Sequence, residues 1–138
     1  PTGIAAINAK GVTLHSFFQL PFGSFIPVVL SGHSHLQSGK VNDPVSLIKN
    51  IQMFDAKRKL LREMELLIID EVSMLRADLL DAIDSVLRHV RRRNYLPFGG
   101  VQVLFIGDML QLPPVTKEHE WQAIQPYYKS AYFFFQKY

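Results

Sequence analysis

Apolar residues along the chain predict two short strands with an amphipathic helix between them. Leu66 to Ile69 are four consecutive branched aliphatic residues, and residues 101–106 form a second apolar run. Continuous runs of this length are typical of parallel strands that are buried on both faces. Between the two runs, apolar residues recur at helical spacing on one face, namely Leu75, Leu79, Leu80, Ile83, Val86, Leu87 and Val90. A strand, a helix and a second strand in this order predict a right-handed βαβ unit in an α/β fold.

Polar residues of the same region indicate the other face of this helix and its end. Asp78, Asp81 and Asp84 fall largely off the apolar face, as does Arg88. Residues 94–100, which read Asn-Tyr-Leu-Pro-Phe-Gly-Gly, combine the residue types that end helices. The return to the second strand is therefore short.

The flanking segments predict further elements around this unit. Apolar residues at helical spacing in residues 46–64 predict a helix, either continuous or broken. Residues 31–44 collect Ser, Gly, His, Asn, Asp and Pro and predict a loop. Residues 130–136, Ser-Ala-Tyr-Phe-Phe-Phe-Gln, predict another strand, although the aromatic tail from Trp121 to Tyr138 also suits base stacking.

Composition excludes several classes of protein. The chain has 138 residues, 48% of them hydrophobic and 20% charged, which suits one globular domain with a single core. It contains no cysteine, which rules out disulfides and thiolate metal sites and fits a reducing compartment. No apolar run reaches the roughly 18 residues of a membrane span, and the first residues lack the order of a signal peptide.

A basic cluster at the end of the predicted helix has two readings. The net charge of +3 is mild, but Arg88, Arg91, Arg92 and Arg93 lie close together. Cations in the last turn of a helix stabilise its dipole, and we favour this reading. The alternative is a patch that contacts phosphates. A second group, His33 and His35, lacks the further ligand that a metal site needs.

Acidic residues follow both predicted strands. Asp70 and Glu71 come directly after the first strand, and Asp108 follows the second. The carboxyl ends of parallel strands meet at one edge of a sheet, which is where ligands of open α/β sheets bind. An acid at such an end helps to hold Mg²⁺ on a nucleoside triphosphate, and an adjacent Glu can activate water. The alternative is a solvent-exposed strand end without a ligand.

Residues beyond the second strand strengthen the nucleotide reading. Gln111 both donates and accepts hydrogen bonds, so it can contact a γ-phosphate or position water without adding charge. Pro113 and Pro114 prevent a helix or a strand from continuing and give the chain an extended exit. Taken alone, Gln111 is equally well explained as an ordinary polar loop residue, and the two prolines as a stiff turn.

Together these residues form a recognisable pattern. The chain closely resembles the petite-integration-frequency helicase family, in the RecD-like branch of superfamily-one DNA helicases. Four blocks carry the resemblance, in order and at matching spacing: residues 1–21, 66–75, 76–93 and 97–115. The resemblance implies a RecA-like P-loop NTPase core, with a parallel sheet flanked by helices. It also implies a protein of DNA repair, recombination and telomere maintenance, in the cytoplasm at a bacterial nucleoid or in a eukaryotic nucleus or mitochondrion.

The resemblance implies a role for each acidic residue and for Gln111. Asp70 would coordinate Mg²⁺ through water, and Glu71 would be the catalytic base for ATP hydrolysis. Gln111 would contact the γ-phosphate and couple the nucleotide state to domain movement, with Asp108 in the same nucleotide-binding motif. The implied cofactors are ATP and Mg²⁺.

The resemblance also implies contacts with single-stranded DNA and with duplex junctions. The matching residues are Thr2, Gly3, Thr13, His15, Ser16 and Pro113. Hydroxyl groups and a glycine backbone can donate to phosphates, and a histidine can stack on a base. Core packing is the alternative for His15 and the favoured reading for Phe17 and Phe18.

One family motif is absent from residues 1–138. The phosphate-binding loop G-x-x-x-x-G-K-[ST] does not occur, and Gly39-Lys40 does not substitute for it because Val41 follows and no glycine stands five residues earlier. We therefore expect residues 1–138 to be part of the first motor domain, with the loop upstream and the second motor domain downstream. The parent would couple ATP hydrolysis to 5′-to-3′ translocation and unwinding, and the isolated fragment would be inactive. The alternative is a non-enzymatic nucleic-acid or protein-binding module that retains a helicase-like shell.

Overall fold

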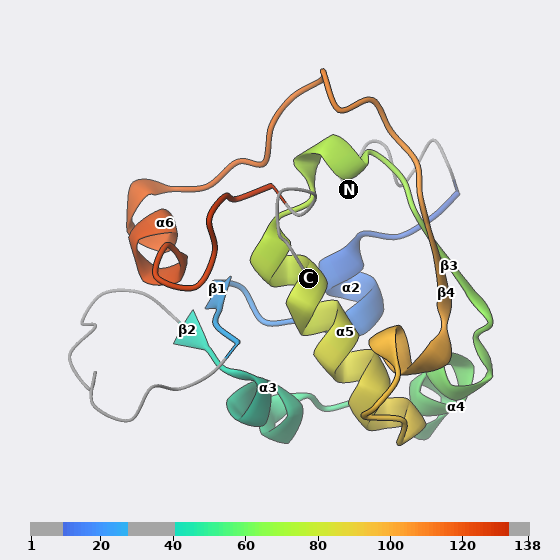
Figure 1. Cartoon of the computed structure of the whole chain (residues 1–138). Helices are drawn as coiled ribbons and strands as arrows, with labels where there is room; N and C mark the ends of the chain where they lie inside the picture. Colours follow the sequence, from blue (N-terminus) through green and yellow to red (C-terminus); the bar gives the residue numbers. More distant parts are fainter. Residues whose placement is uncertain (1–9, 28–40, 133–138) are drawn as a thin grey trace.

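The structure is a computed structural model, and it describes residues 10–27 and 41–132 (Figure 1). The long helix α5 lies at the centre, and shorter elements surround it. In chain order the elements are α2 (Leu14–Phe18), β1 (Ser24–Phe25), β2 (Val41–Asn42), α3 (Pro44–Asn50), α4 (Asp55–Glu63), β3 (Leu66–Ile69), the 3-10 turn η1 (Val72–Met74), α5 (Ala77–Arg91), the 3-10 turn η2 (Pro97–Gly100), β4 (Gln102–Phe105) and α6 (Glu118–Ile124).

The predicted strand–helix–strand unit is confirmed. Strands β3 and β4 pair in parallel, from Leu66 opposite Gln102 to Ile69 opposite Phe105, and α5 lies between them in the chain. Strands β1 and β2 form a second parallel pair beside α6 and α3. The chain therefore has the α/β character that its sequence predicts.

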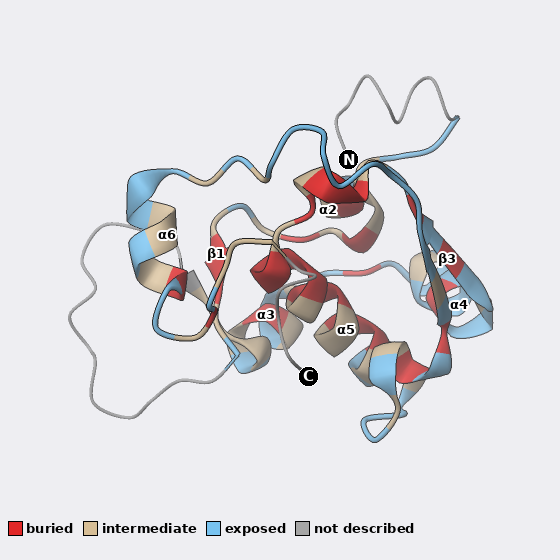
Figure 2. Cartoon of the chain, turned by 45° about the horizontal axis from the view of Figure 1, so that its top comes forward, coloured by how far each residue is buried: buried red, intermediate tan, exposed pale blue. Residues whose placement is uncertain are grey.

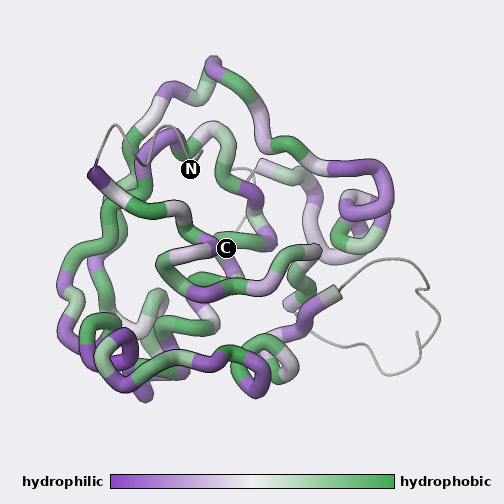
Figure 3. Tube along the Cα trace, turned by 180° about the vertical axis from the view of Figure 1, so that it is seen from behind, coloured by the Kyte–Doolittle hydropathy of each residue, from purple (hydrophilic) through white to green (hydrophobic). Residues whose placement is uncertain are grey.

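Burial of β3 and β4 on both faces was predicted, and this prediction is wrong. Leu67 and Ile69 join the core that α5 dominates, but Leu66 is 45% exposed and Ile68 is 54% exposed. Figure 2 shows this alternation along β3, and β4 is mostly exposed as well. The reason is that α5 covers one face of the pair, while no element of the described segments covers the other. The hydropathy view (Figure 3) shows that both strands nevertheless remain rich in apolar residues.

Helix α5 follows its apolar pattern and ends with local stabilising contacts. Arg92 adopts a left-handed conformation at φ 55° and donates its backbone N–H to the carbonyls of the last turn. Arg91 donates from Nη1 to the carbonyl oxygens of Leu61, Arg62 and Met64, at 2.7–2.9 Å, and so satisfies the end of α4. Arg88 pairs with Asp84 at 2.7 Å. Arg88 and Arg91 therefore lie in the last turn of α5, as predicted, and Arg91 also contacts the end of α4.

One polar residue of α5 is more buried than its sequence position predicted. Asp78, expected off the apolar face, is fully buried. It lies in the first turn of α5, where its carboxylate receives hydrogen bonds from a neighbouring arginine and a backbone N–H. A buried charge is stable there because it is paired and hydrogen-bonded.

The predicted helix over residues 46–64 is broken. It forms α3, which begins with Asp43 as a capping residue, and α4, and residues 51–54 between them are not helical. The predicted loop over residues 31–44 extends too far, because β2 and the start of α3 lie within it. Residues 28–40, which include His33 and His35, lie outside the described residues, as does most of the predicted strand 130–136.

Helix α6 was not predicted. Glu118 and Glu120 stand in its first turn, Trp121 and Ile124 face inward at helical spacing, and Pro126 follows its end. Among the helices of the described segments, none has the length and apolar character that crossing a bilayer requires.

Candidate active site

The carboxyl ends of β3 and β4 are joined by backbone hydrogen bonds. Ile106 donates its N–H to the carbonyl of Ile69 at 2.9 Å, and Val72 donates to the carbonyl of Ile106 at 3.0 Å. These two bonds extend the ladder past both strands. They bring the loop that carries Asp70 and Glu71 against the loop that carries Asp108, as the sequence predicts.

Glu71 occupies an unusual backbone position. Its φ of 52° and ψ of 46° lie in the left-handed region, which costs free energy for a residue with a side chain. The N–H of Glu71 donates to Oδ1 of Asp70 at 2.8 Å, and η1 starts directly afterwards. This sharp turn leaves the Asp70 side chain exposed and the Glu71 side chain half-buried at the edge of the sheet.

Gly107 allows the two loops to approach closely. Its φ is 151°, and a Cβ at this position would lie 2.8 Å from the backbone nitrogen of Val72. Any larger residue would have to displace the backbone that follows Glu71. The glycine is therefore required by the contact between the two loops.

Asp108 and Gln111 form a tight turn beyond β4. Oδ1 of Asp108 accepts from the N–H of Leu110 at 2.9 Å, and the carbonyl of Asp108 accepts from the N–H of Gln111 at 3.1 Å. The side chains of Gln111 and Pro113 are exposed on the same segment. Gln111 is thus held one turn beyond the edge on which Asp70 and Glu71 lie.

This edge suits Mg²⁺ bound to a nucleotide rather than a metal enclosed by protein. No group of three or more potential ligands comes together in residues 10–27 and 41–132. Mg²⁺ keeps several waters and is commonly bound by one or two carboxylates together with phosphate oxygens. The exposed carboxylate of Asp70 fits that role, and the bound ion would supply positive charge to the phosphates.

The segment expected to contact DNA forms the first turn of α2. Thr13 caps this helix, and its Oγ1 accepts from the N–H of Ser16 at 3.3 Å. The ring of His15 stacks on Phe22 with 5.6 Å between centroids. Phe18 is fully buried, which confirms its predicted place in the core, and Phe17 packs against the same core. Thr2 and Gly3 lie outside the described residues.

Comparison with known protein families decides the class of the chain. The family model described as PIF1-like helicase matches residues 1–133. The chain belongs to the PIF1-like helicase family.

Relatives and solved structures of this family agree with that assignment. The chain is 39% identical over 120 residues to the ATP-dependent DNA helicase PIF1 of Saccharomyces cerevisiae, covering 85% of the chain and 12% of the relative. It matches the crystal structure of a Bacteroides Pif1 helicase in complex with ADP-AlF3 and ssDNA at 47% identity and a TM-score of 0.75, covering 97% of the chain and 27% of that structure. For the Candida albicans Pif1 helicase the identity is 36%, the TM-score 0.62, and the coverage 83% and 22%. The chain thus spans less than a third of the length of each of these proteins.

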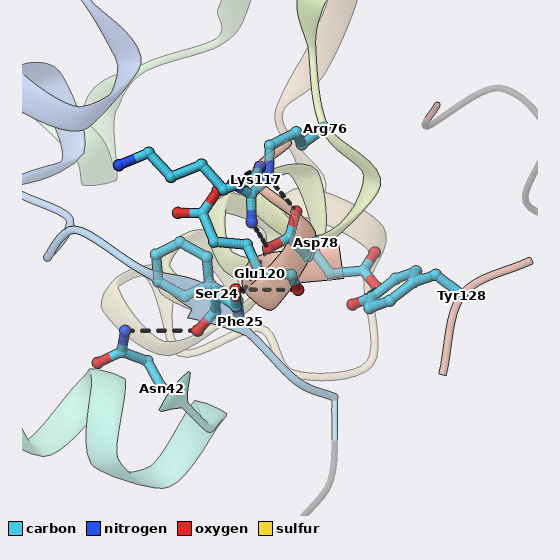
Figure 4. A network of polar contacts seen from close by, with 9 residues as sticks. Ser24, Phe25, Asn42, Arg76, Asp78, Lys117, Glu120 and Tyr128 are labelled. Carbon is cyan, nitrogen blue, oxygen red and sulfur yellow. Dashed lines mark hydrogen bonds and ion pairs between the residues drawn. The ribbon is translucent and has the colours of Figure 1, made fainter. Parts of the chain in front are cut away.

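In this PIF1-like chain, a largely buried ion-pair network lies at the start of α5. Arg76 precedes α5 and forms two hydrogen bonds to the carboxylate of Asp78, at 2.9 and 2.6 Å, and one to Glu120 of α6 at 3.1 Å (Figure 4). Asp78 also accepts from the N–H of Phe25 in β1 at 3.0 Å. The network holds β1 and α6 against the start of α5.

Charge and burial shift the pKa values of two residues here. Burial of His15, aided by the positive charge of Arg76 and opposed by Asp78, lowers the pKa of His15 below its ordinary 6.5. Burial also tends to lower the pKa of Arg76, but its bonds with Asp78 and Glu120 outweigh this and raise it. His15 is therefore neutral at pH 7 and suited to stacking or hydrogen bonding, whereas Arg76 stays charged.

Sequence reasoning missed Arg76 and Glu120 because their pairing depends on tertiary structure. The two residues stand 44 positions apart, and only the packing of α6 beside α5 brings them together. The local signal was the Arg-x-Asp spacing of Arg76 and Asp78 at a helix start. That spacing indicates a pair, but it does not reveal burial.

Proposed function

We propose that this chain is part of the first motor domain of an ATP-dependent DNA helicase. The observation that carries the proposal is the joined edge of β3 and β4, where a PIF1-like chain presents Asp70, Glu71 and Asp108 together. The named relatives are ATP-dependent DNA helicases, which supports the same activity for the whole protein.

ATP and Mg²⁺ are the proposed cofactors of this edge. Asp70 holds Mg²⁺ through water, and Glu71 accepts the proton of the attacking water. Gln111 contacts the γ-phosphate, with Asp108 fixing the turn from which Gln111 projects. This arrangement follows the general logic of phosphoryl transfer, in which the protein positions groups and stabilises charge. The phosphate-binding loop that this chemistry requires is proposed to come from outside residues 1–138.

Single-stranded DNA is the proposed track. The first turn of α2 presents the exposed Ser16 and the neutral His15, and Pro113 lies on the exposed segment beyond β4. A solved structure of the Bacteroides relative is described as bound to ssDNA, and another Pif1 structure is described as concerning DNA unwinding at forked dsDNA by two Pif1 helicases. We propose 5′-to-3′ translocation toward a duplex junction, in whichever cellular compartment holds the DNA: a nucleoid, a nucleus or a mitochondrion.

Unwinding by the intact protein tests this proposal. We expect ATP and Mg²⁺ to support strand separation of a duplex with a 5′ single-stranded tail, and much less separation of a duplex with a 3′ tail. Single-stranded DNA should stimulate phosphate release. An intact protein that binds DNA without any DNA-stimulated phosphate release would instead favour a non-enzymatic binding module.

A further inference from the structure

A cavity of about 300 Å³ lies between α3, α4 and the C-terminal end of α5. The loops that carry Asp70, Glu71 and Asp108 adjoin the N-terminal end of α5. The helix has fifteen residues, so its two ends are about 22 Å apart. The first turn of α2 is also linked to that N-terminal end, since His15 senses the charges of Arg76 and Asp78. The cavity is therefore separate from the candidate nucleotide and DNA sites.

The lining of this cavity combines an apolar floor with a cationic rim. The apolar residues come from α3, from the break between α3 and α4, and from α5: Ile48, Ile51, Met53, Val86 and Val90. Arg58, Arg62 and Arg92 carry positive charge around them, with His89 beside Arg92. None of the described residues that line the cavity is acidic.

The arginines in and around the rim differ in the contacts that their side chains make. Arg62 donates from Nε to the carbonyl of Val90 at 3.1 Å, which ties α4 to the end of α5 beside the cavity. Arg88 and Arg91 are occupied by Asp84 and by backbone carbonyls. By contrast, Arg58 and Arg92 form no ion pair within the described residues.

We propose that this cavity binds an acidic peptide segment of a partner protein, one that inserts an aromatic or aliphatic side chain. Carboxylates of the segment would pair with Arg58 and Arg92, since arginine forms strong, directional bonds with carboxylates. The apolar side chain would cover the floor that Met53 and Val86 provide. A volume near 300 Å³ is at the lower end for ligand pockets, which fits one large side chain.

The lining favours a peptide over nucleic acid. Single-stranded nucleic acid is usually bound along an extended basic groove that has aromatic side chains for base stacking. The described lining residues include no Phe, Tyr or Trp, and the cations surround a single hollow. A free phosphate would gain nothing from the apolar floor.

Binding of a labelled peptide to the intact protein tests this inference without ATP, so it can fail or hold independently of the proposed function. The probe is a fluorescein-labelled nonapeptide, Asp-Asp-Glu-Asp-Phe-Leu-Asp-Asp-Glu, followed by fluorescence anisotropy. We expect Arg58→Glu to weaken binding by about tenfold or more, because one charge-assisted bond is replaced by repulsion. Arg93→Glu is the matched control, because Arg93 is exposed nearby but does not line the cavity, and it should leave binding unchanged.

A second peptide and a competitor complete the test. A peptide with Ser in place of Phe and Leu should bind much more weakly, because it cannot cover the apolar floor. Equal binding of the two peptides would indicate charge attraction alone and would overturn the proposal. Equal effects of the two arginine substitutions, or no binding at all, would also overturn it. The proposal would also be overturned if oligo(dT) displaced the peptide and Arg58→Glu weakened DNA binding. These two results together would assign the cavity to nucleic acid.

Discussion

At the scale of single residues, Arg76 connects the start of α5 with α6 and, through Asp78, with β1. It pairs with the buried Asp78, and its charge adds to burial in lowering the pKa of His15. Breaking a buried pair leaves an unpaired charge inside the protein, which is more costly than losing a surface pair. Arg76 is therefore a positioning residue that holds β1 and α6 against the start of α5.

The first prediction concerns Arg76→Ala. We expect the local free energy of opening to fall by about 3–5 kcal/mol, because the carboxylate of Asp78 stays buried without its cation. The measurement is hydrogen exchange of residues 24–25 and 118–124 in the intact protein. Glu63→Ala is the control, since the Lys59–Glu63 pair is mostly exposed and contributes little. Similar loss of protection in both variants would refute this role of Arg76.

The second prediction concerns pH and His15. Its pKa is near 6.5 when unfolded and lower when folded, so the unfolded state takes up the proton first. Stability is therefore complete above pH 6.5 and falls as the pH drops from 6.5 through the folded pKa. We expect His15→Gln to flatten this part of the stability–pH curve, measured by denaturant unfolding at several pH values. The Asp43 carboxylate, whose pKa is lowered by hydrogen bonds from Ser46, should lose its contribution only at more acidic pH. An unchanged slope near pH 6 in His15→Gln would contradict the assignment.

At the scale of elements, the two strand ends work as one unit because their loops touch. The bond from Val72 to Ile106 and the contact at Gly107 fix the loop of Glu71 against the loop of Asp108. A shift in one loop must therefore move the acids of the other. A misplacement of reacting groups by about 1 Å can slow a reaction greatly, so the proposed hydrolysis should depend on this contact.

The third prediction concerns Gly107→Ala. The added Cβ meets the backbone nitrogen of Val72 at 2.8 Å, and the φ of 151° disfavours any side chain. We expect the free energy of unfolding to fall by about 1–3 kcal/mol. We also expect a lower kcat for DNA-stimulated ATP hydrolysis. The measurements are denaturant unfolding and DNA-stimulated phosphate release of the intact protein. Gln102→Ala, at the opposite end of β4, should change neither, and normal turnover in Gly107→Ala would contradict the proposed contact.

Sequence patterns predicted the elements that depend on local signals. The βαβ unit follows from apolar spacing, which left open whether residues 46–64 form one helix or two, and the acids at the strand ends follow from their place after apolar runs. What the patterns missed depends on tertiary structure: the exposed faces of Leu66 and Ile68, the burial of Asp78 and the docking of α6. An apolar run predicts a strand, but whether each face is covered depends on elements distant in sequence.

At the scale of the whole molecule, we propose that the chain carries only part of a nucleotide-binding site. It covers 12% of the yeast relative and 27% of the Bacteroides structure, and residues 1–138 contain no phosphate-binding loop motif. Backbone N–H groups and a lysine of such a loop normally hold the phosphates on which Mg²⁺ rests. The acids of β3 and β4 are therefore expected to act only together with that loop.

The fourth prediction is that the 138-residue chain alone releases no phosphate from ATP in response to DNA. Without a loop to hold the phosphates, Asp70 and Glu71 have no correctly placed substrate. The measurement is phosphate release with and without single-stranded DNA, with the intact protein as the positive control. Turnover that follows the purified chain through its final purification step would contradict the account.

Phosphate release by the intact Glu71→Gln protein tests the central claim most directly. Glutamine keeps the shape of the side chain but cannot accept a proton, so the variant should bind ATP and single-stranded DNA normally. Its DNA-stimulated hydrolysis should fall by about 100-fold or more, as expected for loss of a general base, and unwinding should stop. Hydrolysis and unwinding within a few-fold of the unsubstituted protein would contradict the assignment of Glu71 as the catalytic base.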